Sequence, residues 1–309
     1  MVTDVVVPPV EDGGTAVPVE DGEPRPSRTG PPVPKPMAIV LAAVLVVGIT
    51  ALFFGIFAFG LSGLQEKRSQ HQLYAELRGR LAAASSVAPY IGGAIPDGAP
   101  VALLNAPAVG IRNVVVVEGT SSGDLLAGPG HLADTPLPGQ AGESVLVGKS
   151  TTAGAPFEHV TQLRKGDAVT VQTGQGPFRY VVEGQLASGA TLPKITTAQG
   201  LLTLVTAGGG SIAPDHLVYV VAKLAGKVVP APAHRPTTVP ASDLQGHNDL
   251  GAWPFVALWF AGFLVASAIS WWLWSRWGIL RTWLVGAPLL LAVLWGLSNE
   301  AMRFLPNVY

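Results

Sequence analysis

Residues 201–210 read Leu-Leu-Thr-Leu-Val-Thr-Ala-Gly-Gly-Gly, a run of aliphatic and β-branched residues that ends in three glycines. A short apolar run followed by turn residues is typical of a buried β-strand, here Leu201–Thr206. Ala207 stands where this strand should end, and the chain contains no cysteine. Thiol chemistry, disulfides and cysteine-based zinc sites are therefore excluded.

Six further runs of the same kind lie on either side of this strand, separated by glycine and proline. They are Val101–Leu104, Asn113–Val117, Ser144–Val147, Ala168–Gln172, Phe178–Glu183 and Leu217–Lys223. Many short strands broken by turn residues predict an all-β barrel or sandwich, which we place at residues 89–225.

Five motifs follow one another through this region. They are Gly98–Pro107 (GAPVALLNAP), Val117–Thr120 (VEGT), Gly128–Gly142 (GPGH, then Thr135, Pro138, Gly139 and Gly142), Val147–Phe157 (VGKSTTAGAPF) and Leu163–Asp167 (LRKGD). In this order and spacing they resemble the motifs of sortases, most nearly the class E sortases of actinobacteria. The resemblance covers residues 99–224 and implies an all-β sortase-type barrel outside the cytoplasmic membrane.

The resemblance also implies where catalytic groups should stand. In sortases a cysteine thiolate attacks the carbonyl of a sorting-signal peptide, a histidine protonates the leaving amine, and an arginine holds the oxyanion or positions the peptide. Here the histidine position holds Lys149, the cysteine position Ala207, and the arginine position Leu217, or His216 if the alignment shifts by one residue. No arginine occurs from residue 180 to 234, so no other alignment restores it. We therefore expect a pseudosortase without cysteine transpeptidation.

The groove that remains is predicted to contain Lys149, Ser150, His131, Thr206, Ala207 and Gly208. Lys149 in an emptied groove would attract an anionic group such as a peptide carboxylate. Alternatively, a desolvated Lys149 with a lowered pKa would activate the hydroxyl of Ser150, Thr206 or Ser211 as a nucleophile. The competing interpretation is that these hydroxyls only form turn hydrogen bonds.

The other polar motifs of the chain do not predict a catalytic or metal-binding function. His131 belongs to the GPGH turn, where we expect a structural hydrogen bond rather than a catalytic base. Residues 208–210 form either a flexible loop or a widened groove. Gly148-Lys149-Ser150 resembles the end of a phosphate-binding loop, but Glu143 occupies the place of the required glycine. No histidine pair has metal-ligand spacing, so we expect neither metal nor cofactor.

Three apolar segments are long enough to cross a bilayer: Met37–Leu61, Trp253–Trp274 and Leu280–Leu297. The last two would otherwise form a buried helical hairpin. The turn between them carries Arg276 and Arg281 and no acid, which predicts that it is cytoplasmic. Residues 1–36 would then lie inside the cell, and residues 62–252 and the last dozen residues outside.

The remaining segments complete the predicted organisation. Residues 1–36 are rich in proline, glycine and acid and are expected to be disordered. Residues 62–88 should form a helical stalk, because Leu73, Leu77 and Leu81 create one apolar stripe that is also compatible with a coiled coil. Residues 226–252 contain four prolines and are predicted to be an extended tether.

Three functions remain open on the sequence alone. The first is a membrane-anchored binding or scaffold protein at the cell surface, whose partner is a sorting-signal peptide, a peptidoglycan stem peptide or a surface protein. The second is a sortase-like acyltransferase or hydrolase with a hydroxyl nucleophile. The third is a structural membrane subunit. A net charge of −1 argues against nucleic acid as a partner.

Overall fold

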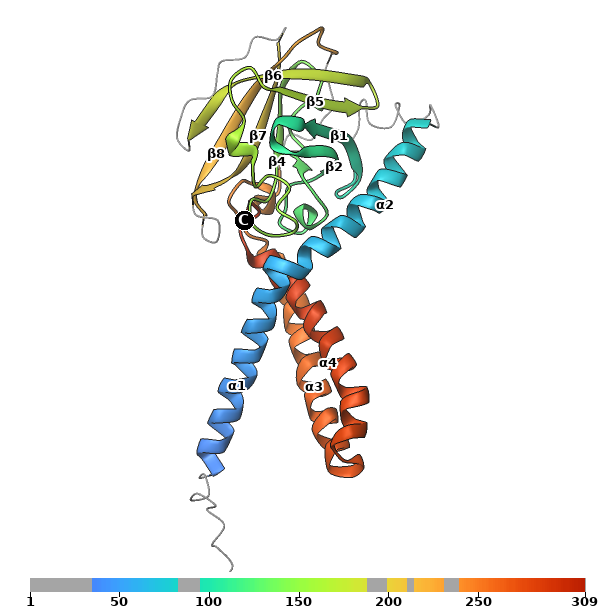
Figure 1. The fold of residues 1–309 in the computed structure, drawn as a ribbon, viewed down its shortest axis with the longest axis vertical. Helices are drawn as coiled ribbons and strands as arrows, with labels where there is room; N and C mark the ends of the chain where they lie inside the picture. The colour runs from blue at the N-terminus through green and yellow to red at the C-terminus, as the bar shows by residue number, and fades with distance from the viewer. Residues whose placement is uncertain (1–34, 83–94, 188–198, 210–213, 231–238, 309) are drawn as a thin grey trace, which may run out of the picture. The chain divides into compact units, whose positions relative to one another are not determined.

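The computed structural model describes residues 35–82, 95–187, 199–209, 214–230 and 239–308. Eight strands form a closed barrel in the order β1-β2-β3-β4-β7-β8-β6-β5 (Figure 1). The strands are β1 (Pro100–Ala106), β2 (Ile111–Glu118), β3 (Gly130–His131), β4 (Gly142–Val147), β5 (Ala168–Thr173), β6 (Gly176–Ala187), β7 (Gly200–Gly209) and β8 (Pro214–Leu224). The predicted fold class is confirmed, and each expected strand lies within an observed one.

The barrel contains two parallel strand pairs among antiparallel ones. The β4–β7 pair is parallel, with Val147 opposite Val205. Because parallel strands end at the same edge of a sheet, the residues that follow β4 meet the end of β7 there. The two-residue β3 pairs with β2 and β4 and was not predicted, because it is too short to show alternation.

Both faces of β7 are buried. Leu202 and Leu204 belong to the main core cluster inside the barrel. Val205 and Ala207, which point the other way, belong to a second cluster on the outer face. A strand that is covered on both faces has a nearly continuous apolar sequence, which is what residues 201–207 show.

Three helices are long and apolar enough to cross a membrane; they include residues 43–82, 250–277 and 280–304. Helix α1 (Lys35–Ile56) continues through a π-helical turn at Phe57–Leu61 into α2 (Ser62–Ala82). Helices α3 (Trp253–Trp277) and α4 (Ile279–Ala301) form a hairpin that turns at Gly278, where φ is 79°. The described residues from Val47 onward form one compact unit, separate from residues 35–46.

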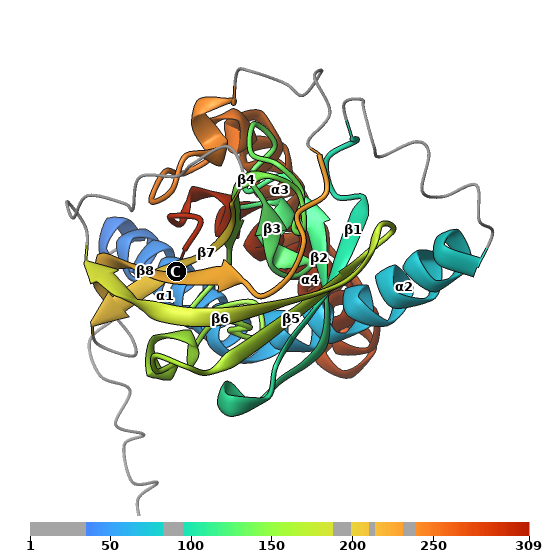
Figure 2. The same ribbon diagram turned by 90° about the horizontal axis from the view of Figure 1, so that it is seen from above.

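The predicted stalk, α2, packs along β1 and β2 (Figure 2). The Gln70 side chain completes the hydrogen bonding of β2: its Oε1 accepts from Val115 N at 2.7 Å, and its Nε2 donates to Val115 O at 3.0 Å and to Ala127 O at 2.8 Å. Leu77, in the middle of the apolar stripe, is buried. The stripe therefore covers the barrel and needs no second helix to bury it.

The segment predicted as an extended tether contacts the barrel at two described places. Val229 forms a β-bridge with Gln140. Further on, Asp243 is buried, and its Oδ2 accepts from Thr120 N at 3.3 Å. Residues 231–238 of this segment lie outside the described residues, and the contacts of Val229 and Asp243 show that irregular backbone can still pack against a barrel.

Residues 302–308 return from α4 to the barrel, as the red segment in Figure 1 shows. A 3-10 turn, Met302–Phe304, follows the helix. Asn307 and Val308 are fully buried. The sequence predicted only that the last dozen residues lie on the same side of the membrane as the barrel.

Candidate functional site

Ala207 and Leu217, two of the positions at which the sequence predicts replaced catalytic groups, lie together at one edge of the barrel. Ala207 near the end of β7 pairs with Leu217 on β8, and Gly208 pairs with His216. Leu217 packs against the outer cluster together with Ala207. The His216 side chain is 47% exposed and its Nδ1 bonds Asp215 Oδ1 at 2.6 Å. Leu217 rather than His216 therefore shares the face of Ala207.

Lys149, which follows β4, is fully buried. Its Nζ donates to Ser122 Oγ at 3.3 Å, and Ser122 Oγ donates to Met302 O at 3.1 Å. Burial lowers the pKa of Lys149 to about 7, since a charged ammonium loses its hydration there. The sequence predicted an ammonium facing an open groove, whereas the structure buries it close to the segment that follows α4.

Ser150 and Thr206 are both engaged with backbone carbonyls. Ser150 donates its N–H and its Oγ to Val308 O, at 3.1 and 3.2 Å. Thr206 Oγ1 donates to Gly148 O at 3.1 Å. In the described part of the chain, the hydroxyl that Lys149 Nζ contacts is that of Ser122. This geometry provides no lysine-activated nucleophile at Ser150 or Thr206.

His131 on β3 has a structural environment. Its Nδ1 lies 2.8 Å from Glu118 Oε2, and its Nε2 lies 3.0 Å from Pro136 O and 3.2 Å from Thr135 Oγ1. The ring is fully buried. The two ring nitrogens thus connect β3 to β2 and to the loop that follows β3. Because both are engaged in these contacts, neither is available to act as a base beside Ala207.

Gly208 and Gly209 belong to β7 and not to a loop; Gly210 and Ser211 lie outside the described residues. A Cβ atom at residue 208 would lie 2.6 Å from Val218 Cγ2 and 2.7 Å from His216 Nε2. Glycine at this position therefore permits the close approach of β8 side chains.

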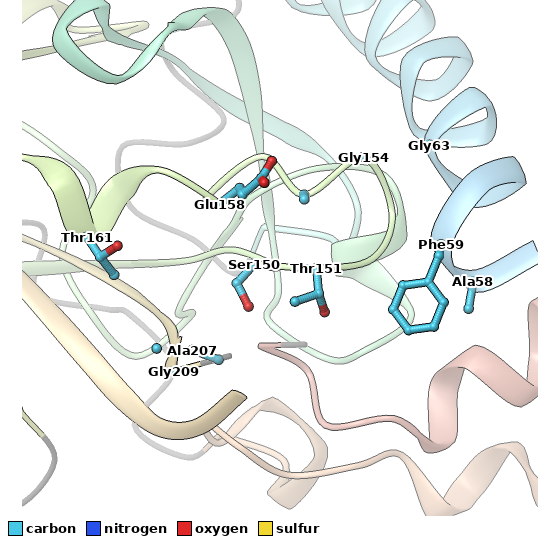
Figure 3. A pocket seen from close by; sticks show the side chains of 12 residues that line it. Ala58, Phe59, Gly63, Ser150, Thr151, Gly154, Glu158, Thr161, Ala207 and Gly209 are labelled. Carbon is cyan, nitrogen blue, oxygen red and sulfur yellow. The ribbon is translucent and has the colours of Figure 1, made fainter. Parts of the chain in front are cut away.

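A pocket of about 390 Å³ opens beside Ala207. Figure 3 shows Ser150 and Thr151 between the end of β7 and Phe59 of the helical segment. Hydroxyls, the Glu158 carboxylate and glycine backbone give one side of the pocket a polar lining, and Phe59 gives the other an apolar one. Lys149, Thr206 and His131 do not line it. Within the described residues, no group of three or more histidines and acids could hold a metal ion.

Sequence reasoning missed three residues of this site: Ser122, Asn307 and Val308. Val308 lies 158 residues after Ser150, the residue that donates to its carbonyl oxygen, and Asn307 directly precedes Val308. Residues 304–308 read Phe-Leu-Pro-Asn-Val, and these apolar residues are the one local signal that predicts burial of this segment.

Comparison with known proteins shows which protein family the barrel resembles. Residues 104–225 match the family model of the sortase domain. A curated relative, sortase D of Bacillus subtilis (strain 168), is 36% identical over 67 residues; this alignment spans 22% of the present chain and 32% of the relative. The match supports a sortase domain in the barrel and does not extend to α1, α3 or α4.

Solved structures similar to the chain include three sortases. The Clostridium perfringens sortase D5 transpeptidase is 20% identical with a TM-score of 0.45, covering 52% of this chain and 99% of that one. Sortase E1 of Streptomyces coelicolor, solved with a tripeptide in its active site, is 25% identical with a TM-score of 0.37, covering 42% and 91%. Sortase E of Streptomyces avermitilis is 27% identical with a TM-score of 0.36, covering 43% and 91%.

Proposed function

We propose that this protein is a membrane-anchored pseudosortase of class E type, which binds a partner at the cell surface and does not catalyse cysteine transpeptidation. The observation that carries the proposal is the edge of β7 and β8, where alanine and leucine face each other at Ala207 and Leu217. The motifs in residues 128–157 support the class E assignment, which suggests an actinobacterial source.

The chemistry of the site supports a binding role. Ala207 offers no nucleophile, and Leu217 offers no donor to an oxyanion. Lys149 is buried away from the pocket with Ser122 as its partner. Its amine would have to turn and lose this position before it reached a substrate carbonyl. At Ser150 and Thr206 the hydroxyl-nucleophile alternative therefore lacks both the base and an unengaged hydroxyl.

The proposed location follows from the three apolar helices and the charges between two of them. Arg276 and Arg281 flank the turn from α3 to α4 and favour its cytoplasmic placement. The barrel and residues 302–308 would then lie outside the cytoplasmic membrane. Its partners there would be sorting-signal peptides, peptidoglycan stem peptides or a surface protein.

A second candidate function is that of a structural membrane subunit. It is favoured by the contacts that the segments before α3 and after α4 make with the barrel and with each other. Arg303 after α4 donates to Asp249 and, at 3.1 Å, to Glu300 Oε2. Thr120 and Asp243 join the barrel to the segment before α3. In this function the barrel would serve mainly to hold α3 and α4 in place.

The proposal is tested with the full chain in lipid nanodiscs and a fluorogenic sorting-signal peptide, with an active sortase as the positive control. We expect neither cleavage nor transfer by the wild type. Ala207→Cys alone should stay inactive, because Lys149 and Leu217 are unchanged. Turnover by the wild type that disappears in Ser150→Ala or Lys149→Ala would overturn the proposal in favour of the hydroxyl nucleophile.

A further inference from the structure

The outer face of β4 and β7 is already covered by a peptide. Val308 is fully buried in the outer cluster, where its neighbours include Val147, Val205 and Ala207. Ala207 is the position at which the family pattern has its nucleophile. The side chain of Val308 therefore occupies the surface where a reacting group would otherwise lie.

The backbone of this segment is held by hydrogen bonds from two sides. Val308 O accepts from Ser150 N at 3.1 Å and from Ser150 Oγ at 3.2 Å. Asn307 N donates to His247 O at 3.0 Å. Main-chain bonds of this kind, combined with a pocket for a side chain, are how protein surfaces recognise extended peptides.

Asn307 adds recognition of a carboxamide. Its Nδ2 donates to Thr120 O at 2.7 Å and to Leu244 O at 3.1 Å. Its Oδ1 accepts from Gly246 N at 2.8 Å. Because the side chain is fully buried, an aspartate, leucine or alanine at this position would leave backbone donors or acceptors without partners. The site is thus selective for asparagine followed by a small branched aliphatic residue.

We propose that this surface is a peptide-binding site whose resident ligand is the chain's own segment, residues 305–308. The inference rests on the proposed binding function and deepens it: a peptide of the same chemistry, added in trans, binds only when this segment has left. The site recognises an extended peptide with a carboxamide side chain next to a small aliphatic one.

The size of the blocking effect follows from the covalent connection between residues 305–308 and the rest of the chain. A segment joined to its site by a short connection has an effective concentration on the order of millimolar. If the free peptide binds with a Kd of about 10 μM, the resident segment weakens binding in trans about 100-fold. Variants that release the segment should regain this factor.

A disulfide test asks directly whether residue 308 occupies the site. Because the chain has no cysteine, Ser150→Cys combined with Val308→Cys creates the one possible pair in each molecule. We expect rapid oxidation to an intramolecular disulfide in the full chain in nanodiscs. Val308→Cys with Gln172→Cys, an exposed position on β5, is the matched control and should stay reduced. Equal oxidation of the two pairs, or a disulfide-linked dimer, would overturn occupancy by the chain's own segment.

A binding test measures the blocking effect. The probe is a fluorescent peptide with the sequence of residues 301–309, added to the full chain. We expect it to bind Asn307→Ala and Val308→Asp about 100-fold more tightly than the wild type. Asn248→Ala, an exposed asparagine nearby, should behave as the wild type. The disulfide-locked protein, whose segment cannot leave, should not bind the probe.

The two tests separate this inference from the proposed function. Equal binding to the wild type and to the Asn307 and Val308 variants would overturn the resident-ligand inference and leave the binding function intact. Absence of binding to folded variants, while the cysteine pair still oxidises, would overturn peptide recognition in both proposals. Transpeptidation by the wild type would overturn the pseudosortase proposal without affecting the disulfide result.

Discussion

Replacing Lys149 with methionine should stabilise the protein near neutral pH. The ammonium is fully buried, its hydrogen-bond partner within the described residues is the Ser122 hydroxyl, and its pKa falls from 10.5 to about 7. Each unit of pKa corresponds to about 1.4 kcal/mol, so burying this amine costs about 5 kcal/mol at pH 7 and below. Methionine has a similar length and no charge; it loses a hydrogen bond worth about 1 kcal/mol. The expected gain is about 4 kcal/mol.

The pH dependence distinguishes this cause from better packing. Above pH 10.5 the lysine is neutral in both the folded and the unfolded chain, so the cost vanishes. As the pH falls from 10.5 to about 7, the unfolded chain takes up a proton that the folded chain does not, and the folded wild type loses stability. The advantage of Lys149→Met should therefore decrease steadily as the pH is raised above 7.

Thermal melting of the full chain in detergent measures this difference. At about 2–4 °C for each kcal/mol, the variant should melt about 10 °C above the wild type at pH 7 and at nearly the same temperature at pH 10. Lys165→Met, at an exposed lysine, controls for the loss of one surface charge. A difference in melting temperature that does not change with pH would refute the reasoning, because it would mean that packing, and not the cost of the buried ammonium, separates the two proteins.

Two further predictions concern the contacts of the barrel. Gln70→Ala should lower the free energy of unfolding by about 2–3 kcal/mol, because Val115 N and O lose their partner. An unfolding free energy equal to that of the control variant Gln172→Ala would contradict this prediction. Burial raises the pKa of Asp124 to about 6 from 3.8, so the folded protein should lose up to about 3 kcal/mol as the pH rises through that interval. Asp124→Asn should remove this loss in pH-dependent melting, and an unchanged profile would contradict the assignment.

The strands could be predicted because their signal is local. Residues 201–207 are apolar on both faces, and this alone indicates a strand that is covered on both sides. The motifs between these strands then indicated a sortase-type barrel, which the family match over residues 104–225 supports. The replacement of the catalytic positions stays a prediction, which rests on the resemblance and on the identity of Lys149, Ala207 and Leu217.

The state of the site could not be predicted, because it depends on contacts between distant parts of the chain. Lysine is rarely buried, so nothing near Lys149 indicated that its side chain turns inward. The partner of Ser150 lies 158 residues away at Val308. Likewise, the prolines of residues 226–252 gave no indication that Asp243 would be buried against Thr120.

The contacts of Gln70 and Asn307 have a mechanical consequence. If the apolar helices span a membrane as proposed, a force applied to the barrel would reach them along routes that include two of these contacts. One runs from β2 through Gln70 into α2, and the other runs from Thr120 through Asn307 into α4. Both routes are noncovalent. A pull strong enough to break these contacts, and those that hold Val308 to Ser150, would separate Val308 from Ala207 and expose the surface that Val308 covers.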